Sequence, residues 1–381
     1  FYDDYNGEIL NRKRSFFYIK GLRLFEDDKF ICEQPIIFQP EIGYLGIICK
    51  KIDGVVHFLM QAKIEPGNIN CVQISPTIQA TKSNFTRAHG GNLPTYFSFF
   101  ENAKRYNVIY DQIQSEQAAR FYKKRNRNMI IEIEDDIKVE SNFCWMTLGQ
   151  IKSLMKIDNL VNMDTRTVLA GLPINYSTID QNDFVKLKSL FTNESLYNSI
   201  TKKDYNLTIP QIYGSLNDYK MFKDITTVEV PLNQLIDWKI SSHGITCMKP
   251  NNFMVRYYDI EISGREVREW MQPLFKAIGI ATFGLISKIN NGALEFLVNL
   301  KPEIGSFDKV EIGPSIQWEP SHYVYDDNVI DQIFRLYLEE RKNICNDVLL
   351  SEEGGRFFHE QNRNVIILLD DKEKIELPDG Y

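Results

Sequence analysis

The sequence predicts an α/β (α+β) protein built from two tandem copies of one folded unit, each a sandwich of helices around a mixed sheet. The first observation is an internal repeat, in which residues of many types recur at a fixed spacing. The second is the order of elements in each copy, where β-rich segments come first and mixed helical and extended segments follow. The third is composition: 43% hydrophobic and 25% charged residues are typical of a globular protein.

The repeat extends through most of both copies. Matching pairs are Gln34 and Gln272, Gly46 and Gly284, Lys63 and Lys301, Glu65 and Glu303, and Gln79 and Gln317. The offset is 238 positions in each pair (272 minus 34, 317 minus 79), and residues 115–128 recur as 351–364 at an offset of 236. A period this long indicates duplicated domains rather than a solenoid. We therefore expect a first lobe over residues 1–172, a connecting segment over 173–236 and a second lobe over 237–381.

The elements of the first copy follow from residue type and spacing. Residues 16–24, 42–50 and 55–63 are rich in Ile, Val, Phe and Tyr, which predicts three strands. Residues 93–104 and 115–125 are predicted helices, and residues 128–134 a further strand. Residues 146–156 have apolar residues at helical spacing, with Thr147 placed to cap a helix. Residues 173–227 show little periodicity outside 184–190, so we expect them to connect the lobes.

Charge and cysteine content exclude several classes of protein. The net charge of −7 and pI of about 5.5 disfavour a nucleic-acid-binding surface, so an anion must be held by a local cationic cluster. No run of 18 apolar residues predicts a membrane span. The six cysteines are scattered without a CxxC pair, and most have apolar neighbours, which favours reduced core thiols in a cytoplasmic protein.

Two polar stripes are predicted to form the floor of a pocket. Gln61, Lys63 and Glu65 alternate, so their side chains emerge on one face of a strand. Such a face needs solvent or a polar pocket, and a solvated edge alone could explain it. The same pattern returns at residues 299–303, and residues 73–79 repeat the two-residue spacing of polar side chains. Two parallel stripes favour the pocket.

Residues 79–91 are dense in hydroxyl, amide and cationic donors and end in two glycines. That composition suits a loop that wraps a polar, anionic ligand, although a solvated loop can look similar. The candidate ligand-binding residues of this loop are Gln79, Thr81, Ser83, Asn84, Thr86 and Arg87. Residues 319–323, the counterpart in the second copy, preserve almost none of them.

Lys123, Lys124, Arg125 and Arg127 form the densest basic cluster of this acidic chain. A diphosphate could be gripped there, although a charge run is usually a solvated helix end. In the second copy the run at 359–363 has lost three of the four cations. Since this cluster and the 79–91 loop both differ between the copies, we expect the active pocket in the first lobe and a degenerate one in the second.

The missing motifs also constrain function. There is no Gly-x-Gly-x-x-Gly and no Walker loop, so neither a nicotinamide cofactor nor a P-loop is implied. No His-x-x-x-His pair or acidic cluster offers a metal cage. We expect neither a cofactor nor a metal.

Several long motifs carry a resemblance to a known family. Residues 58–68 read FLMQAKIEPGN, residues 72–84 read VQISPTIQATKSN, and shorter motifs occupy 34–43, 114–117, 125–128, 145–150 and 158–163. Together they resemble the NDP-hexose 2,3-dehydratase family of deoxysugar biosynthesis over nearly the whole chain. The resemblance implies two tandem Nudix-like α/β/α sandwich domains in a homodimer, with one active nucleotide-sugar pocket and one relic.

The resemblance also implies a reaction and a partner. The expected substrate is a dTDP-4-keto-6-deoxyhexose, which loses its C2 hydroxyl after a base removes the C3 hydrogen. The labile diketo product implies an NAD(P)H-dependent 3-ketoreductase as partner. Glu65, Glu116 and His89 are the candidate bases, and Lys63 could stabilise the enolate oxygen. The residues expected to bind substrate are Gln61, Gln79, Thr81, Ser83, Asn84, Thr86, Arg87, Ser115 and Gln117, with Lys123, Arg125 and Arg127 on the diphosphate.

Two other functions compete with this one. A Nudix-type hydrolase would need a metal-binding box, and the only Arg-Glu-Val, at 265–267, has Tyr257 and Trp270 where the box requires glutamates. Magnesium-dependent release of a nucleoside monophosphate would reveal such an enzyme. A non-catalytic nucleotide-sugar binding module would return its ligand unchanged.

Overall fold

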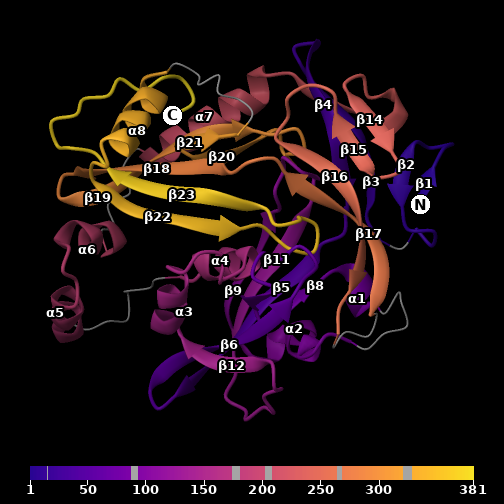
Figure 1. Cartoon of the computed structure of the whole chain (residues 1–381). Helices are drawn as coiled ribbons and strands as arrows, with labels where there is room; N and C mark the ends of the chain where they lie inside the picture. Colours follow the sequence, from indigo (N-terminus) through magenta and orange to yellow (C-terminus); the bar gives the residue numbers. More distant parts are fainter. Residues whose placement is uncertain (15, 87–92, 174–180, 202–207, 264–267, 321–327) are drawn as a thin grey trace.

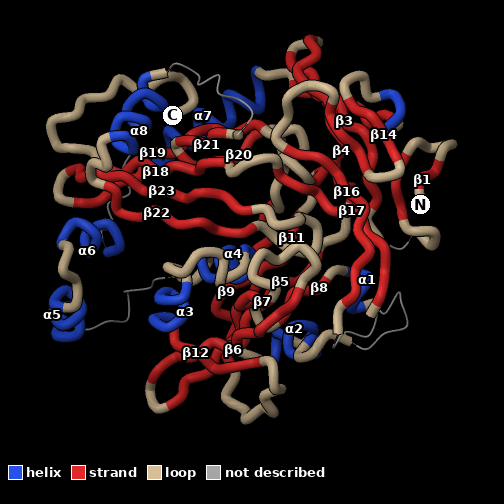
Figure 2. Tube along the Cα trace, viewed as in Figure 1, coloured by secondary structure: helices blue, strands red, loops and turns tan. Residues whose placement is uncertain are grey.

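The computed structural model describes residues 1–381 except 15, 87–92, 174–180, 202–207, 264–267 and 321–327. Each lobe contains one outer sheet and one central mixed sheet (Figure 1). Figure 2 shows that strands dominate the interior of both lobes and that helices lie around them. The mixed α+β architecture in two repeated halves is confirmed, while the likeness to Nudix domains stays a prediction.

The first lobe is built on two sheets. The outer sheet runs β1 (Tyr2–Asp3), β2 (Glu8–Leu10), β3 (Tyr18–Glu26), β4 (Lys29–Phe38) and β10 (Phe121–Tyr122), with β13 (Ile225–Val230) on β3. The central sheet runs β12 (Phe143–Thr147), β6 (Val55–Ile64), β5 (Gly43–Ile52), β11 (Arg125–Glu132) and β9 (Asn107–Ser115), with β7 (Val72–Ser75) on β6 and β8 (Ile78–Ala80) on β5. Only β5 and β11 pair in parallel within it.

The second lobe repeats this plan. Its outer sheet runs β14 (Trp238–Ser241), β15 (Gly244–Cys247), β16 (Phe253–Glu261) and β17 (Glu269–Ala277). Its central sheet runs β20 (Val310–Pro314), β19 (Ala293–Pro302), β18 (Ala281–Asn290), β23 (Gln361–Leu368) and β22 (Ile344–Ser351), with β21 (Ile316–Trp318) on β18. The parallel pair is β18 and β23, as in the first lobe.

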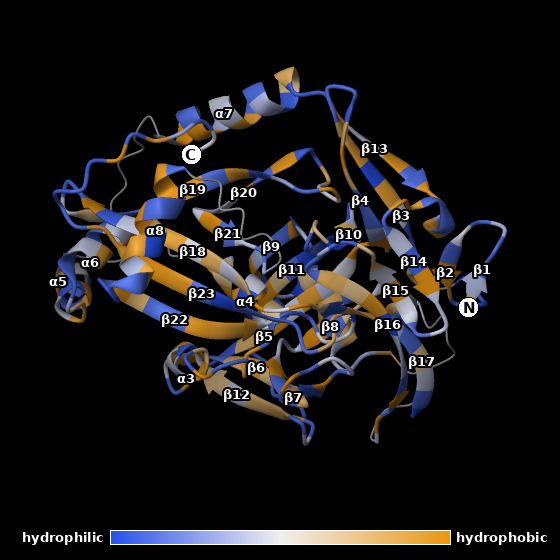
Figure 3. Cartoon of the chain, turned by 45° about the horizontal axis from the view of Figure 1, so that its top comes forward, coloured by the Kyte–Doolittle hydropathy of each residue, from blue (hydrophilic) through white to orange (hydrophobic). Residues whose placement is uncertain are grey.

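Helices and 3₁₀ turns lie around the sheets of both lobes. They are α1 (Lys82–Phe85), α2 (Phe97–Glu101), α3 (Leu148–Leu154), α4 (Met163–Ala170), α5 (Gln181–Ser189), α6 (Glu194–Thr201), α7 (Thr208–Phe222) and α8 (Val329–Glu339), with 3₁₀ turns η1 (Ala103–Arg105) and η2 (Leu232–Gln234). In the first lobe α2 packs on the face that carries Ile48, while α3 and α4 pack on the face that carries Ile47. Successive strand residues point to opposite faces, so one apolar strand serves both layers. In the second lobe, Figure 3 likewise shows both apolar and polar residues along the strands β18, β22 and β23.

The duplication is preserved in side-chain detail. A Cβ on Gly46 would lie 2.2 Å from the Phe100 ring, and one on Gly284 would lie 2.4 Å from the Phe334 ring. Each lobe thus seats a phenylalanine of its covering helix directly on a strand glycine. The tandem repeat read from the sequence is therefore a repeat of packing as well.

Several predicted elements are confirmed. The three early strands are β3, β5 and β6, and residues 128–134 largely coincide with β11. The predicted capped helix is α3, where Thr147 and Gln150 form a capping box. The predicted helix at 93–104 is reduced to the short α2 and a 3₁₀ turn.

Other predicted elements are wrong. Residues 115–125 are no helix, because β9 ends at Ser115 and the chain then turns into β10 and β11. The Lys123 N–H donates to the Gly305 carbonyl of the second lobe at 2.8 Å, and Lys123 takes a φ of 52°. The connecting segment is also more regular than predicted. It forms α5, α6, α7 and β13, and it packs on both lobes, since β13 pairs with β3 and Asn198 donates to Gly292 of the second lobe.

The structure corrects the prediction for the cysteines as well. All six are free, but Cys71, Cys144 and Cys345 are exposed. Cys144 and Cys345 lie on β12 and β22, the edge strands of the central sheets, where one side of the strand faces solvent. Among the described residues, no helix combines the length and the hydrophobicity needed to cross a membrane.

Candidate active site

A lysine, a glutamate and a glutamine meet at the end of β6 in the first lobe. Lys63 Nζ lies 2.9 Å from Glu65 Oε1, and Gln79 Nε2 donates to the same oxygen at 3.1 Å. Asn162 holds the glutamine in turn by donating to its Oε1 at 3.3 Å. Glu65 is only 8% exposed. Gln79 of the second predicted stripe therefore meets Lys63 and Glu65 of the first.

The second lobe completes this centre. Gln79 also donates to Glu353 at 3.4 Å, and Gln117 donates to Glu352 at 2.5 Å. The backbones interlock as well, because the Gly67 N–H donates to the Gly354 carbonyl at 2.7 Å. The centre thus lies where the lobes meet, and sequence analysis, which looked within one lobe, missed its second-lobe members.

Two glutamates of the centre hold protons near neutral pH. Burial, with the nearby charge of Glu353, raises the pKa of Glu116 to about 7, although Lys124 and a hydrogen bond from Asn126 oppose the shift. Burial and then the charge of Glu65 raise the pKa of Glu353 to about 8. Carboxyl groups placed in this range can donate or accept protons at physiological pH.

Asp164 is a third buried acid of the centre and was missed from the sequence. It lies in the first turn of α4, whose N-cap is Asn162, and it is only 2% exposed. Neither of its carboxyl oxygens has a hydrogen-bond partner within the described part of the chain. Burial, followed by the charges of Glu116 and Glu65, raises its pKa well above the ordinary value. Its position one residue beyond the motif at 158–163 was the available signal.

The other predicted loop residues lie around α1. Thr81 Oγ1 donates to Asn84 Oδ1 at 2.9 Å, and Thr86 Oγ1 donates to the Lys82 carbonyl at 2.8 Å. Ser83 belongs to α1, but its side chain is outside the described part of the structure, as are Arg87 and His89. Gln61 lies on β6 opposite Ser75. Ser115 instead donates to Glu311 of the second lobe.

The fold places the four cations of the basic cluster in different surroundings. Arg127 forms a two-pronged pair with Asp111 at 2.7 and 2.5 Å, and Arg363 repeats it in the second lobe. Arg125 lies 3.6 Å over the Phe307 ring, whereas Lys124 is buried and donates to the Glu41 carbonyl. Lys123 is exposed, 5.0 Å over the Tyr122 ring. The predicted contact of Lys123, Arg125 and Arg127 with a diphosphate stays a prediction.

The second lobe repeats only part of the centre. Gln317 donates to Glu303 at 3.3 Å, as Gln79 does to Glu65. Where the first lobe has Lys124, the second has Glu360, and burial raises the pKa of that glutamate to about 7.

The geometry of the acids bears on metal binding. Within the residues that the structure describes, no three His, Cys, Asp or Glu side chains are grouped so as to hold a metal ion. Amide and cationic side chains lie near the carboxyl groups at the lobe junction, which belong to Glu65, Glu116, Asp164, Glu352 and Glu353. Asn126 and Asn362, at matching positions, donate to Glu116 and Glu352 respectively.

The raised pKa values make stability depend on pH. A folded state that keeps protons on Glu116 and Glu353 binds more protons than the unfolded chain between about pH 4.5 and pH 8. The free energy of unfolding should therefore fall as pH rises through this window. Glu353→Gln should flatten the fall by about 3 kcal/mol, measured by denaturant unfolding at pH 5 and pH 8. The exposed Glu101→Gln serves as control, and an equal fall in both variants would contradict the assignment.

Buried acids with pKa values near neutral, beside a lysine, are typical of enzymes that use general acid–base chemistry. The family model for NDP-hexose 2,3-dehydratase matches residues 2–172 and 210–381. The chain belongs to this family.

Three relatives share the same printed name, dTDP-4-dehydro-6-deoxy-alpha-D-glucopyranose 2,3-dehydratase. The protein of Saccharopolyspora spinosa is 37% identical over 339 residues, which cover 88% of this chain and 69% of the relative. That of Amycolatopsis orientalis is 35% identical over 392 residues, covering 100% and 77%. That of Streptomyces violaceoruber is 36% identical over 384 residues, covering 100% and 83%.

Proposed function

We propose that this protein removes water from dTDP-4-dehydro-6-deoxyglucose, the reaction for which its three relatives are named. The observation that carries the proposal is the buried acid–base centre, in which the Lys63 and Glu65 ion pair lies beside carboxyls that hold protons near neutral pH. An elimination needs one group that accepts a proton and another that donates one, and both kinds are present.

The chemistry follows from the position of the ketone. The C3 hydrogen is adjacent to the C4 carbonyl, so its removal gives an enolate rather than a bare carbanion. The C2 hydroxyl is then β to the carbonyl, and it leaves as water once an acid protonates it. The resulting enol relaxes to a 3,4-diketo-2,6-dideoxy nucleotide sugar.

The contacts divide the roles among the side chains. Glu65 accepts the C3 proton, because the ion pair with Lys63 and the hydrogen bond from Gln79 hold its carboxylate in a fixed position. Lys63 stabilises the enolate oxygen as charge develops there. Asp164 donates the proton to the departing hydroxyl, because burial raises its pKa and so favours the protonated acid.

Further proposals concern partners and location. The product carries adjacent ketones and is labile, so an NAD(P)H-dependent 3-ketoreductase should consume it. We also propose that the protein is a homodimer and that it is located in the cytoplasm. Size-exclusion chromatography with light scattering tests the homodimer.

The function is tested by incubating the protein with dTDP-4-keto-6-deoxyglucose, with and without a 3-ketoreductase. We expect a product that has lost one water, trapped as a stable deoxysugar nucleotide when the reductase is present. An unchanged ligand would contradict the proposal. Magnesium-dependent release of dTMP would instead identify a hydrolase.

A further inference from the structure

The segment that leads into α4 is bound to both lobes. In the first lobe, the Ile74 N–H of β7 donates to the Leu160 carbonyl at 2.9 Å, and the Asn162 N–H donates to the Ile74 carbonyl at 2.9 Å. Toward the second lobe, the Asn159 N–H donates to the Leu349 carbonyl of β22 at 2.9 Å. Figure 1 shows α4 between β22 and the central sheet of the first lobe. Asn162, the last residue before this helix, therefore lies at the lobe junction.

The side chain of Asn162 forms three hydrogen bonds to three different elements. Its Oδ1 accepts from the Thr165 N–H at 2.9 Å, which caps α4. Its Nδ2 donates to Ser75 Oγ of β7 at 2.9 Å and to Gln79 Oε1 of β8 at 3.3 Å. The residue is only 2% exposed, so water has little access to these bonds. One buried amide therefore joins the start of α4 to β7 and β8.

The backbone of α4 decides which way this amide points. A backbone N–H can only donate, so the atom of Asn162 that faces the Thr165 N–H is the oxygen, and the amide nitrogen faces Gln79. Gln79 must then turn its own oxygen toward Asn162, which directs its Nε2 to Glu65 at 3.1 Å. The reverse orientation of Gln79 would set a carbonyl oxygen against the carboxylate, where no hydrogen bond can form. The N-terminus of α4 thus fixes the donor that holds Glu65.

Asn162 also sets where Asp164 lies. Asp164 is in the first turn of α4, and neither of its buried carboxyl oxygens has a hydrogen-bond partner within the described part of the chain. Its position therefore depends on the helix and not on bonds of its own. Arg166 of the same helix donates to the Val161 carbonyl at 2.7 Å and to the Ser351 carbonyl of the second lobe at 2.9 Å. The side chain that orients Gln79 thus also caps the helix that carries the proposed acid.

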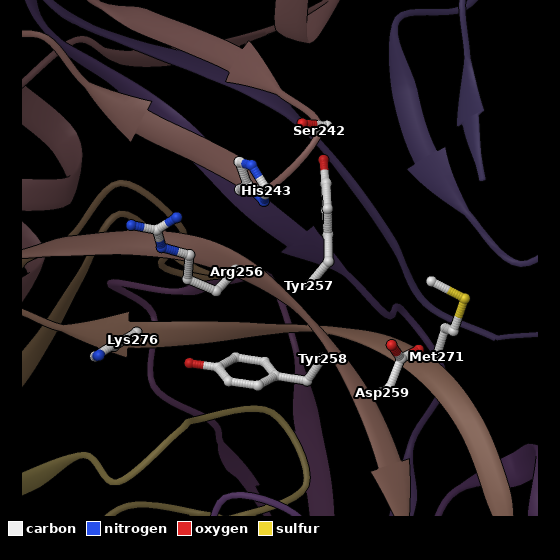
Figure 4. A pocket seen from close by; sticks show the side chains of 8 residues that line it. All are labelled: Ser242, His243, Arg256, Tyr257, Tyr258, Asp259, Met271 and Lys276. Atoms are coloured by element: carbon white, nitrogen blue, oxygen red, sulfur yellow. The ribbon is translucent and has the colours of Figure 1, made fainter.

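The hollow on the outer sheet of the second lobe is separate from these contacts. Figure 4 shows this cavity of about 450 Å³, formed over β16 and β17 and lined by side chains that include Arg256, Tyr258 and Lys276. None of its lining residues belongs to the acid–base centre. The bonds that order the centre come instead from α4, β7 and β8.

We propose that Asn162 is a positioning residue for the dehydration, which orients Gln79 toward the base Glu65 and holds the acid Asp164 through the cap of α4. The inference rests on the proposed function and deepens it, because it explains how a base and an acid on different elements are kept in place together. Elimination needs the base at C3 and the acid at the C2 hydroxyl in one geometry, and a small displacement of either slows it. Asn162 acts through Gln79 and α4 and not on the substrate itself.

Asn162→Ser tests the contact with Gln79 by itself. Serine is as good an N-cap as asparagine, so α4 keeps its start, but the hydroxyl is too short to reach Gln79. We expect C3 hydrogen exchange and loss of water to slow by about 10-fold to 100-fold, with KM changed less than about threefold, because the base is misplaced and substrate binding is not. Asn328→Ser alters the N-cap of α8 in the second lobe and is the matched control, which should keep both rates.

A double-mutant cycle separates positioning from a merely structural role. Gln79→Met fills a similar space but donates no hydrogen bond. If Asn162 acts on the base through Gln79, the variant Asn162→Ser/Gln79→Met should exchange the C3 hydrogen no more slowly than Gln79→Met alone. Single effects that multiply in the double variant would overturn the inference, as would an unaltered kcat in Asn162→Ser. Melting curves for each variant exclude loss of fold as the cause.

Asn162→Ala should add loss of the cap to loss of the Gln79 contact. C3 exchange should match that of Asn162→Ser, but elimination should slow about tenfold further, because the start of α4 and with it Asp164 are displaced. Equal elimination rates in the serine and alanine variants would overturn the role toward Asp164. If the unaltered protein neither exchanges the C3 hydrogen nor releases water, the proposed function itself fails, and the positioning role fails with it.

Discussion

Glu65→Gln is expected to lower kcat by about 10³-fold and to stop exchange of the C3 hydrogen in deuterated water. An amide of nearly the same shape cannot accept the proton, so neither the enolate nor the product forms. The matched control is Glu303→Gln at the equivalent position of the second lobe, which should keep both activities. Exchange is followed by mass spectrometry of recovered substrate, and product by trapping with a reductase.

Asp164→Asn should separate the two steps. The enolate still forms, so C3 exchange continues, but elimination slows by about 10²-fold or more because no acid protonates the leaving hydroxyl. Glu116→Gln and His89→Asn complete the set of candidate bases. Full exchange in Glu65→Gln, Glu116→Gln and His89→Asn alike would refute the assignment of the base to any of them.

Gly67→Ala is expected to destabilise the protein by about 3 kcal/mol or more, because a Cβ at this position would lie 1.6 Å from the Phe357 carbonyl oxygen. That oxygen belongs to the backbone of the second lobe, so relief requires the lobes to separate. Activity should fall with stability, since Glu353 approaches Gln79 across the same junction. Denaturant unfolding measures the change.

Alanine substitutions at two other glycines serve as comparisons for Gly67→Ala. Gly305→Ala would place a Cβ 2.0 Å from the Phe121 carbonyl oxygen at the reciprocal contact, so a similar loss is expected. Gly214 lies in α7 with no atom within 4 Å of an added Cβ, and Gly214→Ala should be neutral or slightly stabilising. If Gly67→Ala unfolded at the same denaturant concentration as Gly214→Ala, the lobe junction would not have the tight packing described here.

Sequence patterns predicted strands more successfully than helices. The early strands of the first lobe alternate or carry continuous β-branched runs, and those patterns reflect short-range burial. Residues 115–125 have good helix formers, yet they turn and bond to Gly305 and Lys124 instead. Helix propensity is a weak preference that tertiary hydrogen bonds override. The connecting segment differs in the opposite direction, because its weak periodicity predicted irregular structure and it forms α5, α6, α7 and β13.

The residues of the candidate site also differ in how well the sequence identified them. Lys63, Glu65 and Gln79 could be selected from the sequence because strand periodicity and the internal repeat both mark them. Arg127 was selected by charge alone, and the fold gives its guanidinium to Asp111. The sequence shows which residues are cationic, but it does not show which of them form an ion pair in the folded protein.

The sequence by itself determined the duplication, the family and the lysine, glutamate and glutamine at the end of β6, because these depend on residue identity at fixed spacing. Only the tertiary structure decided that Glu353 approaches Gln79 and that Asp164 is buried between other acids. Proton affinity depends on burial and on charges that lie far apart in the chain. Both are set when the two lobes pack together.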